Sequence, residues 1–159
     1  VEAASSITLD DFSRTDLRTP QISQEASRVS AIPEVRNALT DFQKEFAHRD
    51  GGAVLDGRDI GTSISPDANL KLFLTASPHA RARRRHAELV AQGYSDSFED
   101  VLEEMRIRDE RDSTRDVAPL RPSQDAVILD TSEITADEAV KIALDHAYRA
   151  RAALFKSAA

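Results

Sequence analysis

Short apolar runs that alternate with longer segments of helical periodicity restrict the fold of this chain more than any other feature. The runs at 70–74 and 126–129 are short, and each is followed by a segment whose apolar residues recur at helical spacing. Predicted strands are 53–55, 70–74 and 126–129, and predicted helices are 20–32, the segment from 33 to the glycines at 51–52, 78–92, 98–111 and 135–155. This alternation predicts an α/β fold with a parallel sheet flanked by helices.

The composition indicates a folded domain that binds a small anion. The chain has 159 residues, of which 40% are hydrophobic, and this is enough for one domain with its own core. A net charge of −7 argues against a duplex-binding surface, which needs a broad basic face, so nucleic acid is not an expected partner. Yet all but four of the 21 basic residues are arginines, whose planar fork suits phosphate oxygens.

Several classes of site are excluded by what the sequence lacks. It has no cysteine, and its four histidines show no spacing of metal ligands, so no metal held by protein side chains is expected. The apolar runs are too short to cross a bilayer, and the start has no signal-peptide pattern. We therefore expect a soluble, cytoplasmic, monomeric protein without a membrane partner. The first residue is Val1 rather than methionine, which suggests a fragment or a processed chain.

A tetrapeptide at the end of the predicted strand 53–55 provides the first candidate site. In Asp56-Gly57-Arg58-Asp59 a cation lies between carboxylates, next to a glycine that lets a ligand approach the backbone. Folds of this class bind ligands at the carboxyl ends of parallel strands. Arg58 could hold a phosphate there and Asp59 could accept a hydrogen bond from an amino group, although a solvated turn would have the same composition.

A charged arm at residues 107–116, which overlaps the end of the predicted helix 98–111, provides the second candidate site. Arg108, Arg111 and Arg115 are spaced so that one helix face carries all three guanidinium groups, with Asp112 beside them. Such a face could grip phosphate oxygens. Ordinary pairing between arginines and carboxylates along a solvated helix explains the same spacing.

The arginine-rich run 81–85 lies near the predicted start of the helix 78–92. Cations are unfavourable at a helix N-terminus unless an anion lies close by, and a bound nucleotide would supply one. Alternatively, the arginines pair with carboxylates of the protein itself, for which the sequence offers Glu88, Glu99 and Asp100.

Five motifs resemble those of the bacterial cytidylate kinases and follow one another in that family's order over nearly the whole chain. They are Leu17-Arg18-Thr19-Pro20, the segment from Ala26 to Arg36, Asp56-Gly57-Arg58-Asp59-Ile60-Gly61-Thr62, Pro66-Asp67-Ala68, and Arg108-Asp109-Glu110-Arg111-Asp112 with Arg115 before Val117-Ala118-Pro119-Leu120. The resemblance implies a P-loop NTPase-like nucleoside monophosphate kinase fold. It also implies that the γ-phosphate of ATP, with Mg²⁺, is transferred to CMP or dCMP to give CDP or dCDP.

The same resemblance implies which side chains recognise the base. Ser27, Arg36 and Asp59 correspond to the positions that contact cytosine. Cytosine offers an exocyclic amino donor and ring acceptors, which a carboxylate, a hydroxyl and a guanidinium can complement. Polar recognition of this kind rejects other bases because a wrong base leaves buried groups unpaired.

The resemblance also implies which side chains contact the sugar and the phosphates. Arg58 and Arg108 hold the acceptor phosphate, while Asp112 and Arg115 contact the sugar and phosphate at a lid of about residues 106–120. Phosphoryl transfer depends on positioning and charge stabilisation rather than on a nucleophilic side chain. The arginines assigned to catalysis are Arg58, Arg108 and Arg115. Those assigned to the cofactor side are Arg84 and Arg85.

The chain departs from the family at one motif. It contains no GxxxxGK[ST] sequence and no strand with a glycine-rich loop that could cradle the ATP phosphates. We therefore expect the chain to begin inside the monophosphate-binding insert, with residues 1–50 completing the insert and its following helices and residues 51–159 forming the core α/β region. Without the N-terminal strand and P-loop, the chain by itself is expected to phosphorylate CMP poorly.

Other interpretations stay open on the sequence alone. The chain could be a catalytically inactive nucleotide-binding module that regulates a partner, or a kinase for another monophosphate such as UMP or AMP. It could also be a structural protein whose charged helices mediate assembly. The preference between CMP and dCMP is left open as well.

Overall fold

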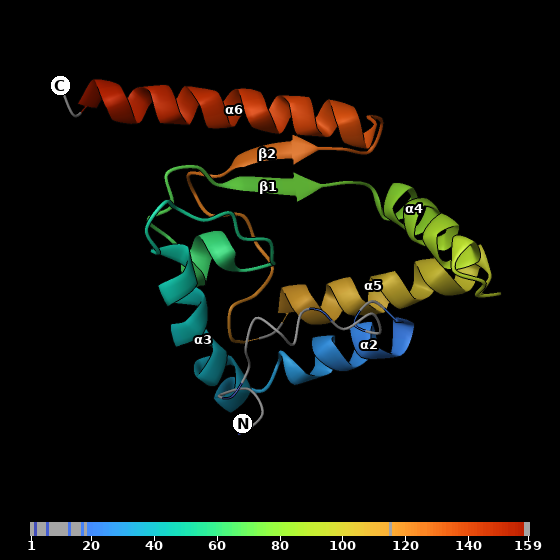
Figure 1. Cartoon of the computed structure of the whole chain (residues 1–159). Coiled ribbons are helices and arrows are strands. Elements are labelled where there is room, and N and C mark those ends of the chain that lie inside the picture. The colour runs from blue at the N-terminus through green and yellow to red at the C-terminus, as the bar shows by residue number, and fades with distance from the viewer. Residues whose placement is uncertain are drawn as a thin grey trace. The chain divides into compact units, whose positions relative to one another are not determined.

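The computed structural model describes residues 2, 6, 13, 17, 19–114 and 116–157, and it divides the chain into two units that interleave in sequence. Unit 1 comprises residues 1–65 and 110–121, and unit 2 comprises residues 66–109 and 122–159. Figure 1 shows the helices and strands of both units. The division expected from the sequence, at residue 50, stays a prediction.

Unit 1 contains two helices close to their predicted positions. Helix α2 spans Pro20–Val29 and helix α3 spans Pro33–Ala47. Each opens with a proline, which suits the first turn because no intrahelical N–H donor is needed there. The hydroxyl of Thr19 accepts a hydrogen bond from the N–H of Ile22 at the start of α2. Helix α2 ends three residues before its predicted end, at a cap formed by Ser30.

The predicted strand at 53–55 is wrong. These residues have no regular secondary structure, and Val54 is 96% exposed. Gly51 and Gly52 have φ of 86° and 81° and turn the chain after α3, a conformation that favours glycine. In the described part of the chain the sheet has two strands, and neither pairs with this segment. An apolar run without a neighbour to complete its backbone hydrogen bonds does not become a strand.

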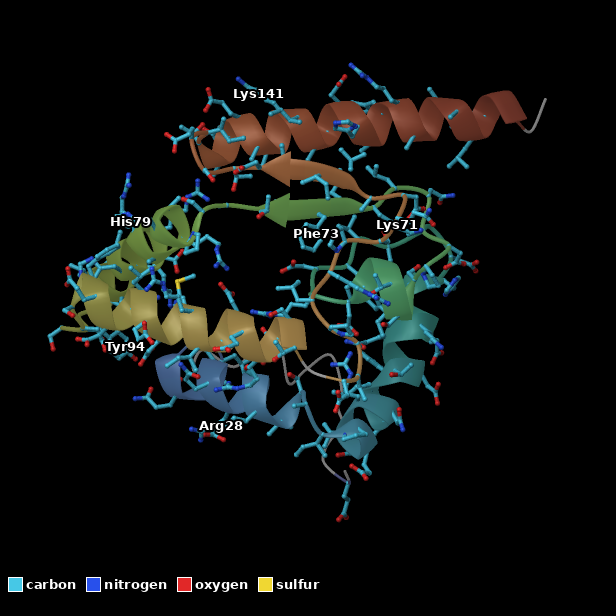
Figure 2. All side chains as sticks on the ribbon, turned by 180° about the vertical axis from the view of Figure 1, so that it is seen from behind. Arg28, Lys71, Phe73, His79, Tyr94 and Lys141 are labelled. Atoms are coloured by element: carbon cyan, nitrogen blue, oxygen red, sulfur yellow. The ribbon has the colours of Figure 1, made fainter. Side chains whose placement is uncertain are left out.

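Unit 2 is built on two parallel strands. Strand β1 (Leu72–Thr75) pairs with β2 (Val127–Asp130) in register from the first residue to the last. The predicted strands at 70–74 and 126–129 are thus confirmed with small shifts, as is the α/β class with parallel pairing. Helix α6 (Ala136–Ser157) runs alongside β2 in Figures 1 and 2, and Lys141 lies on its side away from the strands in Figure 2. None of the described helices is long and apolar enough to span a membrane.

Helices α4 (Pro78–Ala91) and α5 (Phe98–Thr114) contribute most of the buried apolar side chains of unit 2. Both lie where the sequence predicts them. The ring of Phe98 packs on that of His79, labelled at the start of α4 in Figure 2, with 4.8 Å between ring centroids. The buried apolar residues of unit 2 in the described part of the chain are Ala80, Ala82, Leu89, Val101 and Leu129.

Two ion pairs brace unit 2. Arg81 of α4 donates from both terminal nitrogens to both carboxylate oxygens of Asp109 in α5, and this hydrogen bonding raises the pKa of Arg81. Lys71, just before β1, donates to Asp125 just before β2 at 2.6 Å, and this bond lowers the pKa of Asp125. Arg81 therefore has a protein anion beside it, so the cation near the start of α4 needs no bound nucleotide to offset it.

Candidate functional site

A buried ion pair joins α3 to the segment before Ile60 in unit 1. Arg36 donates from Nη2 to Oδ2 of Asp59, and from Nη1 to the carbonyl oxygen of Ser30 at 3.1 Å. The two charged side chains are 15% and 12% exposed. At this burial each charge depends on the other for the interactions it has lost with water. The pair therefore fixes a guanidinium fork and a carboxylate side by side.

A second ion pair lies next to the first. Nε of Arg58 forms an ion pair with Oδ2 of Asp112, whose side chain is 3% exposed, whereas that of Arg58 is 39% exposed. Among the described side chains, Asp112 is the bulkiest that is fully buried. Because Arg58 and Asp59 are neighbours in the chain, both ion pairs meet at one peptide bond. We call Arg36, Arg58, Asp59 and Asp112 the charge cluster.

Ser27 of α2 connects the charge cluster to the end of α5. Its hydroxyl accepts a hydrogen bond from Nη1 of Arg111 at 3.0 Å and donates to Oδ1 of Asp112 at 3.4 Å. Ser27 is 4% exposed. The sequence placed Arg111 on one candidate phosphate-binding face with Arg108 and Arg115, but the resemblance gave it no role. The spacing of these arginines does not show which partner each one contacts.

The backbone that positions the charge cluster is a tight turn rather than a strand end, contrary to the sequence prediction. Residues 56–59 lead into η3 (Ile60–Ile64), a single π-helical turn of the kind often found at functional sites. The N–H of Ser63 donates to the carbonyl oxygen of Asp59 at 2.8 Å. A side chain at Gly57 would place its Cβ 2.9 Å from Cγ1 of Ile60. A larger residue at position 57 would therefore require the side chain of Ile60 to shift.

Three of the remaining residues assigned from the sequence belong to unit 2, and one is not described. Arg108 is half-buried in the part of α5 that belongs to unit 2. Arg115 lies outside the described residues. Arg84 donates to backbone and hydroxyl oxygens of the segment after β2. Arg85 contacts Glu88 at 3.3 Å, one of the carboxylates that the sequence offered as partners.

The chemistry of the charge cluster suits recognition rather than covalent catalysis. It provides guanidinium donors and carboxylate acceptors, with the hydroxyl of Ser27 beside them. Groups of this kind bind oxyanions and polar ring edges and stabilise charge that develops on them. Within the described ranges, no group of three or more His, Asp or Glu side chains could hold a metal ion.

The family model of cytidylate kinase matches residues 3–149. The chain belongs to the cytidylate kinase family. A cytidylate kinase of Cereibacter sphaeroides is 55% identical over 145 residues, which make up 91% of this chain and 70% of the relative. A cytidylate kinase of Methylocella silvestris is 53% identical over 144 residues, 91% of this chain and 67% of the relative. A cytidylate kinase of Carboxydothermus hydrogenoformans is 49% identical over 135 residues, which make up 84% of this chain and 60% of the relative.

Membership of this family confirms the resemblance found in the motifs. It also confirms the nucleoside monophosphate kinase fold, of the P-loop class, and makes the protein a phosphotransferase. The roles of individual side chains remain predictions. The charge cluster and Ser27 contain five of the residues to which the sequence assigned such roles.

Proposed function

We propose that the protein transfers the γ-phosphate of ATP to CMP or dCMP and forms CDP or dCDP. Relatives that share about half of its residues are named cytidylate kinases. The observation in this structure that carries the proposal is the charge cluster, where two guanidinium groups and two carboxylates meet beside a buried hydroxyl. CMP needs both kinds of charged group: a cation for its phosphate and a carboxylate for its amino group.

In this proposal Ser27, Arg36 and Asp59 bind the base. The exocyclic amino group of cytosine donates hydrogen bonds, and the carboxylate of Asp59 and the oxygen of Ser27 can accept them. Arg36 donates to the acceptors on the ring. In the ligand-free protein Arg36 and Asp59 bond to each other. When cytosine binds, its amino group takes the place of Arg36 as a donor to Asp59, and its ring acceptors take the place of Asp59 as acceptors for Arg36. Each buried charge therefore keeps a partner.

Arg58, Arg108 and Arg115 are proposed to bind the acceptor phosphate and stabilise the charge on the phosphoryl group as it moves. Such transfers proceed without a covalent enzyme intermediate, so fixed cations supply most of what the protein contributes. Arg58 binds the phosphate through its terminal N–H groups, while its Nε stays paired with Asp112. Asp112 also accepts a hydrogen bond from a sugar hydroxyl, because a carboxylate can accept several hydrogen bonds. Arg108 and Arg115 belong to the proposed lid at about 106–120, whereas Arg58 lies outside it, just before η3.

ATP is the proposed phosphoryl donor, and it brings Mg²⁺ with it. This ion is usually held by nucleotide phosphates with one or two carboxylates and several waters. When bound, Mg²⁺ neutralises charge on the phosphates. Arg84 and Arg85 are proposed to support the donor side. Arg84 of α4 donates hydrogen bonds to Thr131, directly after β2. This is the carboxyl end of a parallel strand, where such sheets bind ligands.

We further propose that the protein works as a cytoplasmic monomer without nucleic acid or membrane partners. The net charge of −7 argues against a nucleic-acid partner. The division into residues 1–50 and 51–159 is kept as the proposed domain organisation.

Binding of nucleoside monophosphates, measured by isothermal titration calorimetry, tests the proposal. CMP and dCMP should bind more tightly than AMP, and Arg58→Met should weaken CMP binding at least about tenfold because a charge-assisted hydrogen bond is lost. The matched control is Arg28→Met, since Arg28 is exposed and pairs with Glu25 on the surface of α2. Tighter binding of AMP than of CMP would contradict the base assignment. Formation of CDP from CMP and ATP would exclude an inactive binding module, whereas a failure to form CDP would not, because the chain by itself is expected to phosphorylate CMP poorly.

A further inference from the structure

The hydroxyl of Ser27 is held between two groups of opposite hydrogen-bonding character. Arg111 approaches its oxygen at 3.0 Å, and Oδ1 of Asp112 lies at 3.4 Å. Ser27 and Asp112 are 4% and 2% exposed, so water does not compete freely for these bonds. All three residues belong to unit 1. Their arrangement fixes where the single hydroxyl proton of Ser27 points.

The direction of that proton follows from what each neighbour can do. A guanidinium group only donates, so Arg111 occupies one lone pair of the Ser27 oxygen. A carboxylate only accepts, and the other oxygen of Asp112 is in an ion pair with Arg58. The proton of Ser27 therefore points to Asp112. Because that proton is used, any further hydrogen bond to the Ser27 oxygen must involve a lone pair.

We propose that Arg111 and Asp112 hold Ser27 as a hydrogen-bond acceptor and thereby set the preference of this site for cytosine over uracil. The inference rests on the proposed function, in which Ser27 contacts the base. Cytosine carries an amino donor at C4, whereas uracil carries a carbonyl acceptor at the same position. An acceptor fixed at Ser27 bonds to the first and opposes the second. Asp112 is thus a positioning residue for base selection, besides its proposed contact with the sugar.

The substitution Asp112→Asn should reverse this polarity without changing the size of the side chain. Nε of Arg58 is a permanent donor, so the new amide turns its oxygen toward Arg58 and its NH₂ group toward Ser27. Ser27 then receives two hydrogen bonds, one from the amide and one from Arg111. Its own proton has to point in a third direction, toward the ligand. The same hydroxyl becomes a donor, which suits the carbonyl of uracil.

The measurement is the ratio of the dissociation constants of UMP and CMP, with UMP determined by competition against CMP in isothermal titration calorimetry. The two ligands share ribose and phosphate, so any loss of sugar or phosphate contacts in Asp112→Asn cancels in the ratio. The wild type should prefer CMP. In Asp112→Asn the ratio should fall at least about tenfold, which is the scale of one buried hydrogen bond made or opposed.

Three further variants separate this mechanism from a general weakening. In a Ser27→Ala background, Asp112→Asn should change the ratio by less than about twofold, because the group that carries the effect is gone. Ser27→Ala alone should weaken CMP and leave UMP nearly unchanged. Asp116→Asn is the matched control, because the same substitution on an exposed side chain removes the same charge four residues further along. It should leave the ratio unchanged.

The outcomes distinguish this inference from the proposed function. If the wild type prefers CMP but Asp112→Asn keeps the wild-type ratio, the polarity mechanism is wrong while the base assignment stands. If the wild type does not bind CMP, the proposed function itself fails, and this inference fails with it.

Thermal melts followed by circular dichroism check that each variant is folded. Should Asp112→Asn not fold, Ser27→Ala decides, since equal weakening of CMP and UMP would overturn the role of Ser27 as an acceptor.

Discussion

Replacing Arg36 by Met should lower the free energy of unfolding by about 3 kcal/mol. Removing one partner of a buried ion pair typically costs 3–5 kcal/mol, and the lower end applies here because the side chains of Arg36 and Asp59 keep 15% and 12% of their exposure. The variant also loses the hydrogen bond to the carbonyl oxygen of Ser30. The cost arises mostly from the carboxylate of Asp59, which keeps its charge but loses this cation.

Urea unfolding followed by far-ultraviolet circular dichroism measures this cost. The double variant Arg36→Met with Asp59→Asn should recover at least about 1 kcal/mol, because the uncompensated charge is removed together with its partner. Arg28→Met is the matched control. The side chains of Arg28 and Glu25 are 66% and 63% exposed, and such a surface pair contributes less than about 1 kcal/mol. If Arg36→Met and Arg28→Met cost the same, the argument from burial is refuted.

Two further predictions concern unit 2. Leu89→Ala should cost about 2–5 kcal/mol in urea unfolding, because Leu89 is 4% exposed, whereas Leu74→Ala at a 59% exposed position should cost far less. The second concerns acid. Asp130 has its pKa lowered below 3.8, chiefly because the hydroxyl of Ser132 donates to it. A carboxyl of lowered pKa binds fewer protons in the folded state, so its contribution is present above the unfolded pKa and is lost as the pH falls through the folded value. Asp130→Asn should therefore flatten the fall in stability below about pH 4, as measured by urea unfolding at several pH values.

The sequence predicts the helices well because their signals are local. Apolar spacing lies within each segment, and at α4 it is joined by Pro78 at the start and Gly93 after the end, so α4 and α5 are placed to within a few residues. The run at 53–55 shows the limit of such signals. A strand depends on hydrogen bonds to a neighbour that can lie far along the chain, and no local pattern shows whether that neighbour is in place.

The site was only partly predictable, for a related reason. The family motifs indicated Ser27, Arg36 and Asp59, but they do not say which charged groups bond to each other. Arg58 has carboxylates on both sides in sequence and yet pairs with Asp112. Partner choice among so many arginines and carboxylates is decided by tertiary packing, which spacing along the chain does not encode.

The pairing inside the charge cluster has a consequence for small anions in the cell. Arg36 and Arg58 already have counter-ions supplied by the protein, so the charge cluster carries no net charge. Orthophosphate can bond to the terminal N–H groups of Arg58, but it has no part that recognises Arg36 and Asp59 together. A cytosine nucleotide brings ring acceptors and an amino group along with its phosphate, and so can bond to Arg36, Asp59 and Arg58 at once.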